Sequence, residues 1–356
     1  MKEVLVTGAP NEPLKTTIID SPIPTPGPNQ LVIRNVVVGT NPKDWKIPVV
    51  MSGKLPPMNT GDDVAGYVHA LGEGVTEFHV GDRVAAFHEM MKPHGAFAEY
   101  TLAHAHTTFH LPPQTSFEEG ATIPLAAMTA AVGLYARLGL PEPYAKVHAA
   151  REAAKAGVIV YGAASAVGAF VIKLLVKADV HPILAVAGNG IGFVEGLLDK
   201  GKGDVVVDYR KGDEEVVKGL KAAAKGDVLF AYDAVSEKGS YQNICQVLSQ
   251  KGGAAITLVL PGKKYDEIPS SITQSVTTVG SVHGQPDDLA LLGFAWYRLF
   301  GQGLREGWFS GHPHEVVAGG LGGVVEGLNN LKDGKASAVK YLYRVADTEG
   351  VSASKI

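Results

Sequence analysis

The segment from Gly157 to Lys173, with the sequence GVIVYGAASAVGAFVIK, constrains the fold more than any other part of the chain. Its first residues, Val158 to Tyr161, are β-branched or aromatic and predict a buried strand. A glycine-containing turn and an apolar run follow, and this order predicts a tight turn that opens a helix. Backbone N–H groups at such a helix start can face a phosphate, so the segment is a candidate dinucleotide-binding turn.

Two other interpretations of this segment stay open at this point. Residues 156 to 172 carry no charge, as in a transmembrane helix, although three interior glycines and the strand-like start oppose a membrane span. The spacing from Gly162 to Gly168 is G-x-x-x-x-x-G and not the full G-x-G-x-x-G. Alone, the segment is therefore equally compatible with an ordinary buried strand–helix unit.

Composition limits the class of protein. A chain of 356 residues with 46% hydrophobic residues predicts two domains, and a net charge of −4 does not favour nucleic acid as a partner. The single cysteine, Cys245, excludes an internal disulfide and a cysteine-based zinc site.

Because Met1 to Val4 lack the start of a signal peptide, we expect a cytoplasmic protein. The C-terminal Ser354-Lys355-Ile356 is close to the peroxisomal S-K-L signal, so peroxisomal targeting is the alternative.

The predicted elements separate a β-rich first part from an alternating second part. Residues 1–110 predict short strands at 31–38, 64–71, 83–87 and 96–102, which indicates a small barrel. A helix is predicted at 117–138. The alternating elements are strands at 158–161, 182–187, 205–208, 228–234, 254–259 and 276–282 and helices at 166–178, 191–200, 214–224 and 241–249. They predict a doubly wound parallel sheet. Helices at 289–300 and 321–331 and a strand at 338–345 are expected to return to the first domain.

Taken together, these features resemble the medium-chain dehydrogenase/reductase superfamily. The motifs occur in the family order: Gly81-Asp82-Arg83-Val84, Gly95-Ala96-Phe97-Ala98-Glu99-Tyr100, Gly162 to Gly168, and the tail from Gly319 to Lys335 and Lys340. Asn41-Pro42-Lys43-Asp44-Trp45-Lys46 is similar to the N-P-x-D-x-K loop of a zinc-independent branch, the fungal enoyl reductases that act beside polyketide synthases and the quinone oxidoreductases. The resemblance implies an α/β fold with a GroES-like β-barrel domain (1–126 and 284–356) and a Rossmann nucleotide-binding domain (127–283).

The resemblance also indicates that no metal is used. Zinc alcohol dehydrogenases of the superfamily need a cysteine where this chain has Gly39-Thr40-Asn41-Pro42, and Gly-His-Glu where it has Gly61-Asp62-Asp63. His104, His106 and His110 form a loose cluster without a carboxylate or thiolate partner at a recognisable spacing. We expect them to be solvated or hydrogen-bonded within the fold.

Candidate catalytic residues follow from the family positions. The loop with Asn41, Lys43 and Lys46 should face the nicotinamide, where Asn41 could donate through its amide and a lysine could stabilise an enolate or contact a phosphate. The alternative is a local turn at Asn41 with two solvated lysines. Thr129 matches a helix threonine whose hydroxyl meets the nicotinamide ribose or the substrate, or it bonds the preceding turn.

The expected cofactor is NADPH. Ser165, Ala166 and Val167 should present N–H groups to the pyrophosphate, with Gly162 and Gly168 allowing close approach. The second strand ends at Ala187-Gly188-Asn189-Gly190, and no acid occurs before Glu195, which favours NADP over NAD. With no arginine in that segment, Asn189 and, by resemblance, Tyr209 are expected at the 2′-phosphate. The resemblance adds cofactor contacts at Gly188, Val259, Leu260 and Lys340 and substrate contacts at Gly280, Ser281, Val282 and His283.

We therefore expect a zinc-independent NADPH oxidoreductase that transfers hydride to the β-carbon of an activated C=C, in an enoyl thioester or enone of polyketide-type secondary metabolism. The alternatives are an NADPH:quinone oxidoreductase and, from another class, a non-redox NADP-binding protein. Expected partners are a small-molecule or carrier-bound acyl substrate and a polyketide synthase, with neither nucleic acid nor membrane. The sequence leaves open a monomer or a homodimer, the latter by pairing of an exposed strand near 276–282.

Overall fold

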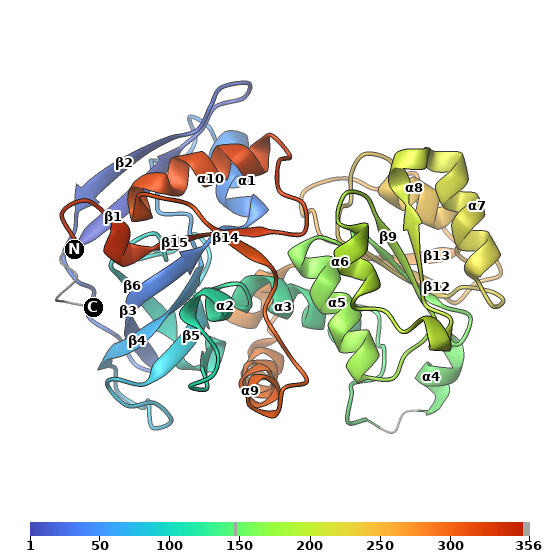
Figure 1. The fold of residues 1–356 in the computed structure, drawn as a ribbon, viewed down its shortest axis with the longest axis horizontal. Helices are drawn as coiled ribbons and strands as arrows, with labels where there is room; N and C mark the ends of the chain where they lie inside the picture. The colour runs from blue at the N-terminus through green and yellow to red at the C-terminus, as the bar shows by residue number, and fades with distance from the viewer. Residues whose placement is uncertain (146–147, 352–356) are drawn as a thin grey trace. The chain divides into compact units, whose positions relative to one another are not determined.

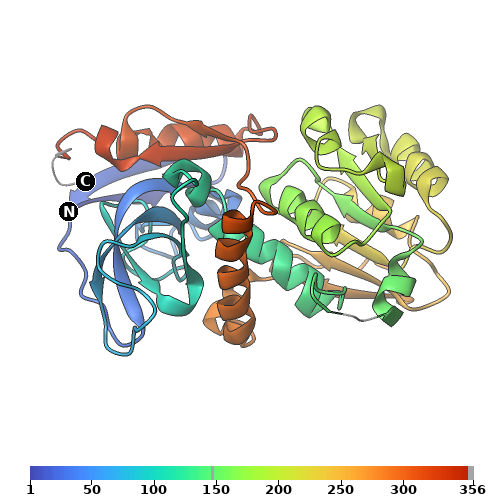
Figure 2. The same cartoon turned by 60° about the horizontal axis from the view of Figure 1, so that its bottom comes forward.

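The computed structural model describes residues 1–145 and 148–351, and it shows two compact units (Figures 1 and 2). Unit 1 contains Met1–Ala126 and the chain from Gly280 onward, and unit 2 contains Ala127–Val279. The second boundary differs from the expected 283/284, so that residues 280–283 belong to unit 1. The assignment of the two units to substrate and cofactor binding stays a prediction.

Unit 2 contains a six-stranded sheet in the order β10-β9-β8-β11-β12-β13, and all of its pairings are parallel. This order confirms the predicted doubly wound sheet. The strands are β8 (Val158–Tyr161), β9 (Ile183–Ala187), β10 (Val205–Asp208), β11 (Phe230–Asp233), β12 (Ala254–Leu258) and β13 (Ile272–Val276). The helices are α4 (His148–Ala154), α5 (Ala166–Lys177), α6 (Ile191–Glu195), α7 (Asp213–Ala223) and α8 (Ser240–Cys245). Figure 1 shows α5 and α6 on one side of the sheet and α7 and α8 on the other.

The local sequence explains why α7 forms and packs as it does. Its first turn carries Asp213, Glu214 and Glu215, whose negative charges stabilise the positive end of the helix dipole. Val216, Val217 and Leu220 are its buried residues and lie on one face at helical spacing. The helix expected at 214–224 agrees with these bounds to within one residue at each end.

Unit 1 contains a seven-stranded sheet with the path β14-β15-β3-β4-β5-β7, from which β6 branches by pairing with β3. A separate antiparallel pair, β1 and β2, completes its strands. The strands are β1 (Lys2–Thr7), β2 (Lys15–Asp20), β3 (Gln30–Gly39), β4 (Asp63–Leu71), β5 (Arg83–Phe87), β6 (Tyr100–His104), β7 (Thr108–His110), β14 (His314–Val316) and β15 (Lys340–Arg344). Its core includes Leu31, Ile33, Val64, Val84 and Phe97, none of which is exposed. Since β14 and β15 come from the chain's last part, the predicted return to this unit is confirmed.

Helices cover the sheet of unit 1. They are α1 (Pro42–Val50), α2 (Phe117–Ala121), α9 (Ala290–Glu306) and α10 (Val324–Lys332). Figure 2 shows α9 as an unbroken helix, and it packs against β7 and the short helix Ala105–Thr107. Helix α3 (Pro124–Ala131) contains the boundary between the two units and continues as a π-helix from Val132 to Arg137.

Two elements expected from the sequence differ in the structure. The strand expected at 276–282 ends at Val276, and residues 279–283 form a short 3-10 helix. The helix expected at 117–138 is interrupted before Pro124, because a proline cannot supply the N–H that a continuous helix needs there. Residues 158–161 and 166–177 form β8 and α5, in agreement with the argument against a membrane span in this segment. Within the described residues, no helix is long and apolar enough to cross a membrane.

Candidate functional site

The turn between β8 and α5 has the backbone geometry of a phosphate-binding turn. Gly162 adopts φ +76°, which favours glycine, and a Cβ on Gly168 would lie 2.3 Å from the Gly162 carbonyl oxygen. Ser165 caps the helix by accepting the N–H of Gly168 at 3.1 Å. The N–H groups of Ala166 and Val167 belong to the first helical turn, which has no intrahelical acceptors for them. The five predicted residues of this turn therefore fit a pyrophosphate, with close backbone approach and a positive helix end.

The neighbouring strands end beside this turn. Tyr161 of β8 pairs with Asp233 of β11, and the next segment places the side chain of Val235 against Gly162, where a Cβ would lie 2.6 Å away. Asp233 is buried and accepts the N–H groups of Val235 and Ser236 and the hydroxyl of Ser240. Burial raises the pKa of Asp233 to about 6. This carboxyl group thus holds the loop that packs on the cofactor turn.

Val259 and Leu260, predicted to contact the cofactor, follow β12 at the same carboxyl edge of the sheet. The N–H of Val259 donates to the Ser236 hydroxyl at 2.8 Å, and the Leu260 carbonyl accepts from Tyr265 at 2.9 Å. Ligands of doubly wound sheets bind at this edge. The structure brings these residues to it, and their contact with a cofactor stays a prediction.

The residues predicted around the 2′-phosphate lie together. The Tyr209 ring covers Gly188, where a Cβ would lie 2.6 Å from it. Asn189 accepts a hydrogen bond from Nη1 of Arg210 at 2.8 Å. An arginine does therefore stand beside Asn189, although the sequence segment around Asn189 contains none. Asp208 accepts from Nε and Nη2 of the same arginine, and the hydrogen bond from Arg210 lowers the pKa of Asp208 to about 2.

Asn41 belongs to a buried group in unit 1 that we call the Lys340 network, made of Asn41, Asp63 and Lys340. The Asn41 amide donates to Asp63 at 2.8 Å, and the Lys340 ammonium donates to Asp63 and, at 3.2 Å, to the Asn41 amide oxygen. Lys340 is only 3% exposed, and Asp63 is fully buried. Asn41 and Asp63 lie in the two segments that carry zinc ligands in the alcohol dehydrogenases, and Lys340 reaches both of them from β15.

Lys43 belongs to a second buried group, the Lys43 network of Lys43, Asp44, Asp62 and His88. Its ammonium lies 2.8 Å from Asp44 and also contacts Asp62 and the Thr60 carbonyl. Although burial opposes the charged form, the carboxylates raise the pKa of Lys43 above its ordinary value. The two His88 ring nitrogens lie 2.9 Å from an Asp62 oxygen and 3.0 Å from the Pro93 carbonyl oxygen. The alternative of a solvated Lys43 is wrong.

Lys46 and Thr129, the other two candidate catalytic residues, are placed differently. The Lys46 ammonium lies 5.6 Å from the centre of the Trp45 ring, and Lys46 is not a member of either network. Thr129 in α3 is 6% exposed, and its carbonyl accepts the Tyr232 hydroxyl at 2.7 Å. The catalytic roles of both stay predictions.

The predicted substrate residues Gly280 to His283 lie in the short 3-10 helix of unit 1. Ser281 and Val282 are buried; the Ser281 hydroxyl donates to Asp287, and the Val282 carbonyl bonds the His106 ring at 2.8 Å. The His283 ring lies 5.4 Å from that of His104 and 5.6 Å from that of His106, measured between ring centres. Burial and these two imidazoles lower the pKa of His283 to about 2. His104, His106 and His283 thus form a cluster of rings, and His104 also bonds the Glu89 carboxylate at 3.0 Å.

Neither this cluster nor any other group of three or more His, Cys, Asp or Glu side chains in residues 1–145 and 148–351 is arranged to hold a metal ion.

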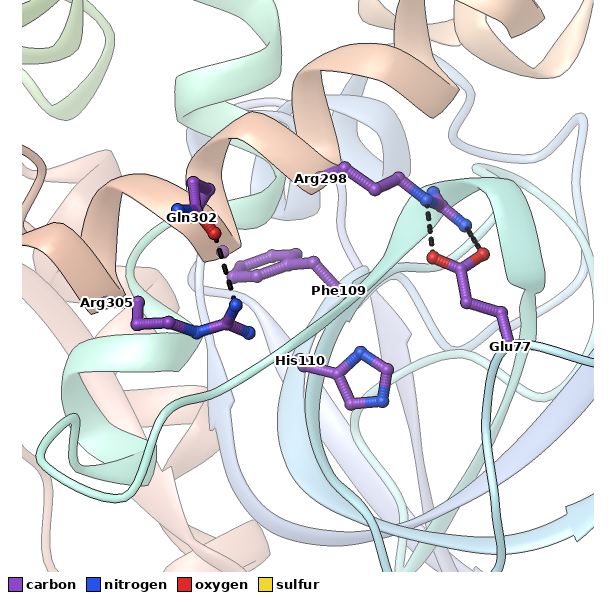
Figure 3. Close-up of a pocket in the computed structure, with 7 residues that line it drawn as sticks. Glu77, Phe109, His110, Arg298, Gln302 and Arg305 are labelled. Carbon is purple, nitrogen blue, oxygen red and sulfur yellow. Dashed lines mark hydrogen bonds and ion pairs between the residues drawn. The ribbon is translucent and has the colours of Figure 1, made fainter.

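Unit 1 also has a surface pocket of about 220 Å³ (Figure 3). Arg298 pairs there with Glu77, and Arg305 donates to Gln302 at 3.1 Å. Its lining residues are Glu77, Phe109, His110, Arg298, Gly301, Gln302 and Arg305, so the candidate site residues lie elsewhere.

Sequence reasoning missed three residues that the structure places at these sites. In the sequence, Asp63 is notable only because it stands in the segment where zinc enzymes have Gly-His-Glu. The strand register that pairs Asp63 with Gly39 places it beside Asn41. Arg210 follows the next strand along the sheet, so the parallel pairing of Ala187 with Asp208 carries it to Asn189. Tyr232 lies inside a strand pattern and gave no sequence signal for its contact with Thr129.

Comparison with known proteins supports the predicted family. Residues 27–113 match the model of the alcohol dehydrogenase GroES-like domain. A trans-enoyl reductase of Gibberella fujikuroi is 49% identical over 90% of this chain and 91% of its own length. A trans-enoyl reductase of Aspergillus sclerotiorum is 30% identical over 96% of this chain and 100% of its own length. A mycobacterial protein solved as a complex with NADPH shares the fold, with a TM-score of 0.72 at 19% identity over 96% of this chain and 100% of that protein.

The matching GroES-like segment, the doubly wound sheet and the two sequence relatives agree. The chain belongs to the trans-enoyl reductase family of the medium-chain dehydrogenase/reductase superfamily, and it is an oxidoreductase.

Proposed function

We propose that the protein is a zinc-independent, NADPH-dependent reductase of the activated C=C in an enoyl thioester or enone of polyketide-type metabolism. The observation that carries this proposal is the Lys340 network. Of the two segments that hold zinc ligands in the alcohol dehydrogenases, one here supplies Asn41 and the other Asp63, and both side chains bond the buried Lys340 ammonium of β15. A site built this way has no electron-pair acceptor for an unactivated alcohol or ketone, so the substrate has to be activated by its own conjugation.

The cofactor fits the turn of unit 2. Ser165, Ala166, Val167 and the glycines would hold the pyrophosphate, while Val259 and Leu260 would meet the nicotinamide end. When bound, the nicotinamide supplies the hydride that reaches the β-carbon of the substrate. The protein's task is then to orient both partners and to stabilise the negative charge that develops on the carbonyl oxygen.

The two networks indicate which side chains could stabilise the negative charge on the carbonyl oxygen. The Asn41 amide and the Lys43 ammonium are bound within the fold, which supports a role in shaping the loop at the start of α1. Lys46, one turn further along the same helix, and the Thr129 hydroxyl are the proposed donors toward the substrate oxygen or the nicotinamide ribose. A donor of this type contributes by being held in place before the charge develops.

NADPH is the proposed cofactor because Arg210 stands beside Asn189. A guanidinium group has five N–H donors. Hydrogen bonds to Asp208 and Asn189 use three of them, which leaves the guanidinium able to donate to a 2′-phosphate. Both oxygens of Asp208 accept from the same arginine, and Asp208 ends β10 and not β9, after which the ribose-binding acid of an NAD enzyme stands.

The test is the oxidation of NADPH, followed by its absorbance, with a crotonyl thioester, a simple enone and a benzoquinone, each with and without a metal chelator. We expect turnover of the thioester or enone that the chelator does not change. Turnover of the quinone alone would point to a quinone oxidoreductase. Tight NADPH binding without turnover of any acceptor would contradict the enzyme proposal, and an NADPH preference below about tenfold over NADH would contradict the cofactor proposal.

Two partner assignments belong to this proposal. The proposed form of the substrate is an acyl group bound to a carrier protein. The proposed partner is a polyketide synthase. Comparing turnover of the crotonyl group on a free thiol with turnover on a phosphopantetheinyl carrier protein tests the first. A higher kcat/KM on the carrier is expected, and equal values would contradict it.

A further inference from the structure

We infer that Tyr232 is a positioning residue that holds Thr129 in place relative to the nucleotide-binding sheet. This inference rests on the proposed role of the Thr129 hydroxyl. Its starting observation is the hydrogen bond from the Tyr232 hydroxyl to the carbonyl of Thr129, at 2.7 Å, between a strand of the sheet and the helix that carries Thr129. Both residues lie in unit 2.

The contact is built into the sequence of the helix. Gly133 lies one turn after Thr129, and a Cβ there would be 2.2 Å from the Tyr232 ring. Any side chain at this position would displace the ring, so the absence of one allows the hydroxyl to reach back to Thr129. The segment from Val132 to Arg137 is a π-helix, a rare helical form that is frequently found at functional sites.

Tyr232 is itself fixed. It is fully buried and close to the Thr277 side chain, whose hydroxyl lies 2.7 Å from the Thr257 hydroxyl. Tyr232 pairs with Val160 of β8, two residues before Gly162, and the next residue, Asp233, holds the loop that packs on Gly162. Two successive residues of β11 thus connect Thr129 and the cofactor turn to one rigid strand.

This arrangement assigns a specific task to the tyrosine hydroxyl. Hydride transfer needs reacting groups aligned to a fraction of an ångström, and a small displacement of a positioned group lowers the rate strongly. The strand holds the phosphate end of the cofactor through the loop after Asp233, and Tyr232 holds the helix residue proposed to meet the ribose or substrate. The hydroxyl of Tyr232 therefore acts on catalysis through Thr129.

The experiment is a double-mutant cycle with Tyr232→Phe and Thr129→Ala, assayed with NADPH and a crotonyl thioester. Tyr232→Phe keeps the ring and removes only the hydroxyl. We expect it to lower kcat by about fivefold or more in the natural background and by less than about twofold in Thr129→Ala, because the residue it positions is then absent. A purely structural role would lower kcat by the same factor in both backgrounds, and that result would overturn the inference while leaving the role of Thr129 intact.

Three further measurements complete the double-mutant cycle: kcat of Thr129→Ala alone, a control variant, and a variant that replaces Tyr232→Phe. If Thr129→Ala has the natural kcat, the proposed role of Thr129 fails and the inference fails with it. Thr277→Val is the matched control, since it disturbs the same buried hydroxyl chain and leaves Tyr232 able to donate to Thr129. It should lower the melting temperature while kcat stays within about twofold. Gly133→Ala, which displaces the ring, serves if Tyr232→Phe does not fold, and it should show the same dependence on Thr129.

Discussion

Replacing Gly168 by alanine should abolish tight NADPH binding while the protein stays folded. The new Cβ would lie 2.3 Å from the Gly162 carbonyl oxygen and 2.9 Å from the Ala163 Cα. Carbon and oxygen atoms that are not bonded stay about 3.3 Å apart, so the helix start and the turn must separate by roughly 1 Å. Both contacts are backbone atoms, and no side-chain rotation can relieve them.

The size of the effect follows from the hydrogen bonds that such a shift would break. A displacement of roughly 1 Å takes a bond of about 2.9 Å beyond the range in which it contributes. Hydrogen bonds to a charged group contribute about 1.5–3 kcal/mol each. If the N–H groups of Ala166 and Val167 each donate to the pyrophosphate, losing both raises the dissociation constant of NADPH by about a hundredfold or more.

The assay is a titration of intrinsic fluorescence or of heat with NADPH, with circular dichroism to confirm folding. Gly322→Ala is the matched control, because no atom lies within 4 Å of its Cβ position and its φ is not in the left-handed region. Its dissociation constant should be unchanged. A folded Gly168→Ala protein that binds NADPH within about threefold of the natural one would refute the assignment of this turn to the pyrophosphate.

Three more variants test other parts of the account. Arg210→Gln should weaken NADPH about tenfold and leave NADH unchanged, measured by titration of both; an equal loss for both would contradict a role at the 2′-phosphate. Lys340→Met leaves the fully buried Asp63 without its cation and should destabilise unit 1 by about 3 kcal/mol, seen as a lower melting temperature that Asp63→Asn partly restores; an unchanged melting temperature would show that the network contributes nothing. His283→Asn should reduce the loss of stability between pH 7 and pH 5. Because burial lowers the pKa of His283 to about 2, the unfolded state binds a proton that the folded state excludes, and stability falls as the pH falls below about 6.5 by about 2 kcal/mol at pH 5. If chemical denaturation of His283→Asn and of the natural protein depends on pH in the same way, His283 does not cause the loss of stability.

The regular elements of unit 2 could be predicted because each depends on local signals. The strand at Val158–Tyr161 has consecutive apolar β-branched residues, and the helix after it begins at a serine that caps it. The π-helix after Ala131 gave no such signal, because it depends on Tyr232 reaching Gly133 from a strand about a hundred residues away. The strand expected at 276–282 failed for a similar reason. Its apolar residues Val279 and Val282 are buried, and Val282 packs against Gly293 of α9, a contact distant in sequence that overrides the preference of valine for a strand.

In the candidate site, too, only the residues that are contiguous in the sequence could be predicted. The glycines and the cap of the cofactor turn are contiguous and could be read from the sequence. The Lys340 network could not, because its members come from three strands or loops and meet only through the register of β3 with β4 and β15. The contact of Arg210 with Asn189 could not be predicted either, because it forms only through the parallel pairing that brings the end of β10 beside the end of β9.

The central claim is that hydride goes to the β-carbon of a conjugated acceptor without a metal. The direct measurement uses NADPH deuterated at the transferable position, a crotonyl thioester and a chelator, and it locates the deuterium in the product by NMR. The account predicts one deuterium at the β-carbon of a saturated butyryl thioester. Deuterium on a carbinol carbon, or no transfer in the presence of the chelator, would contradict it.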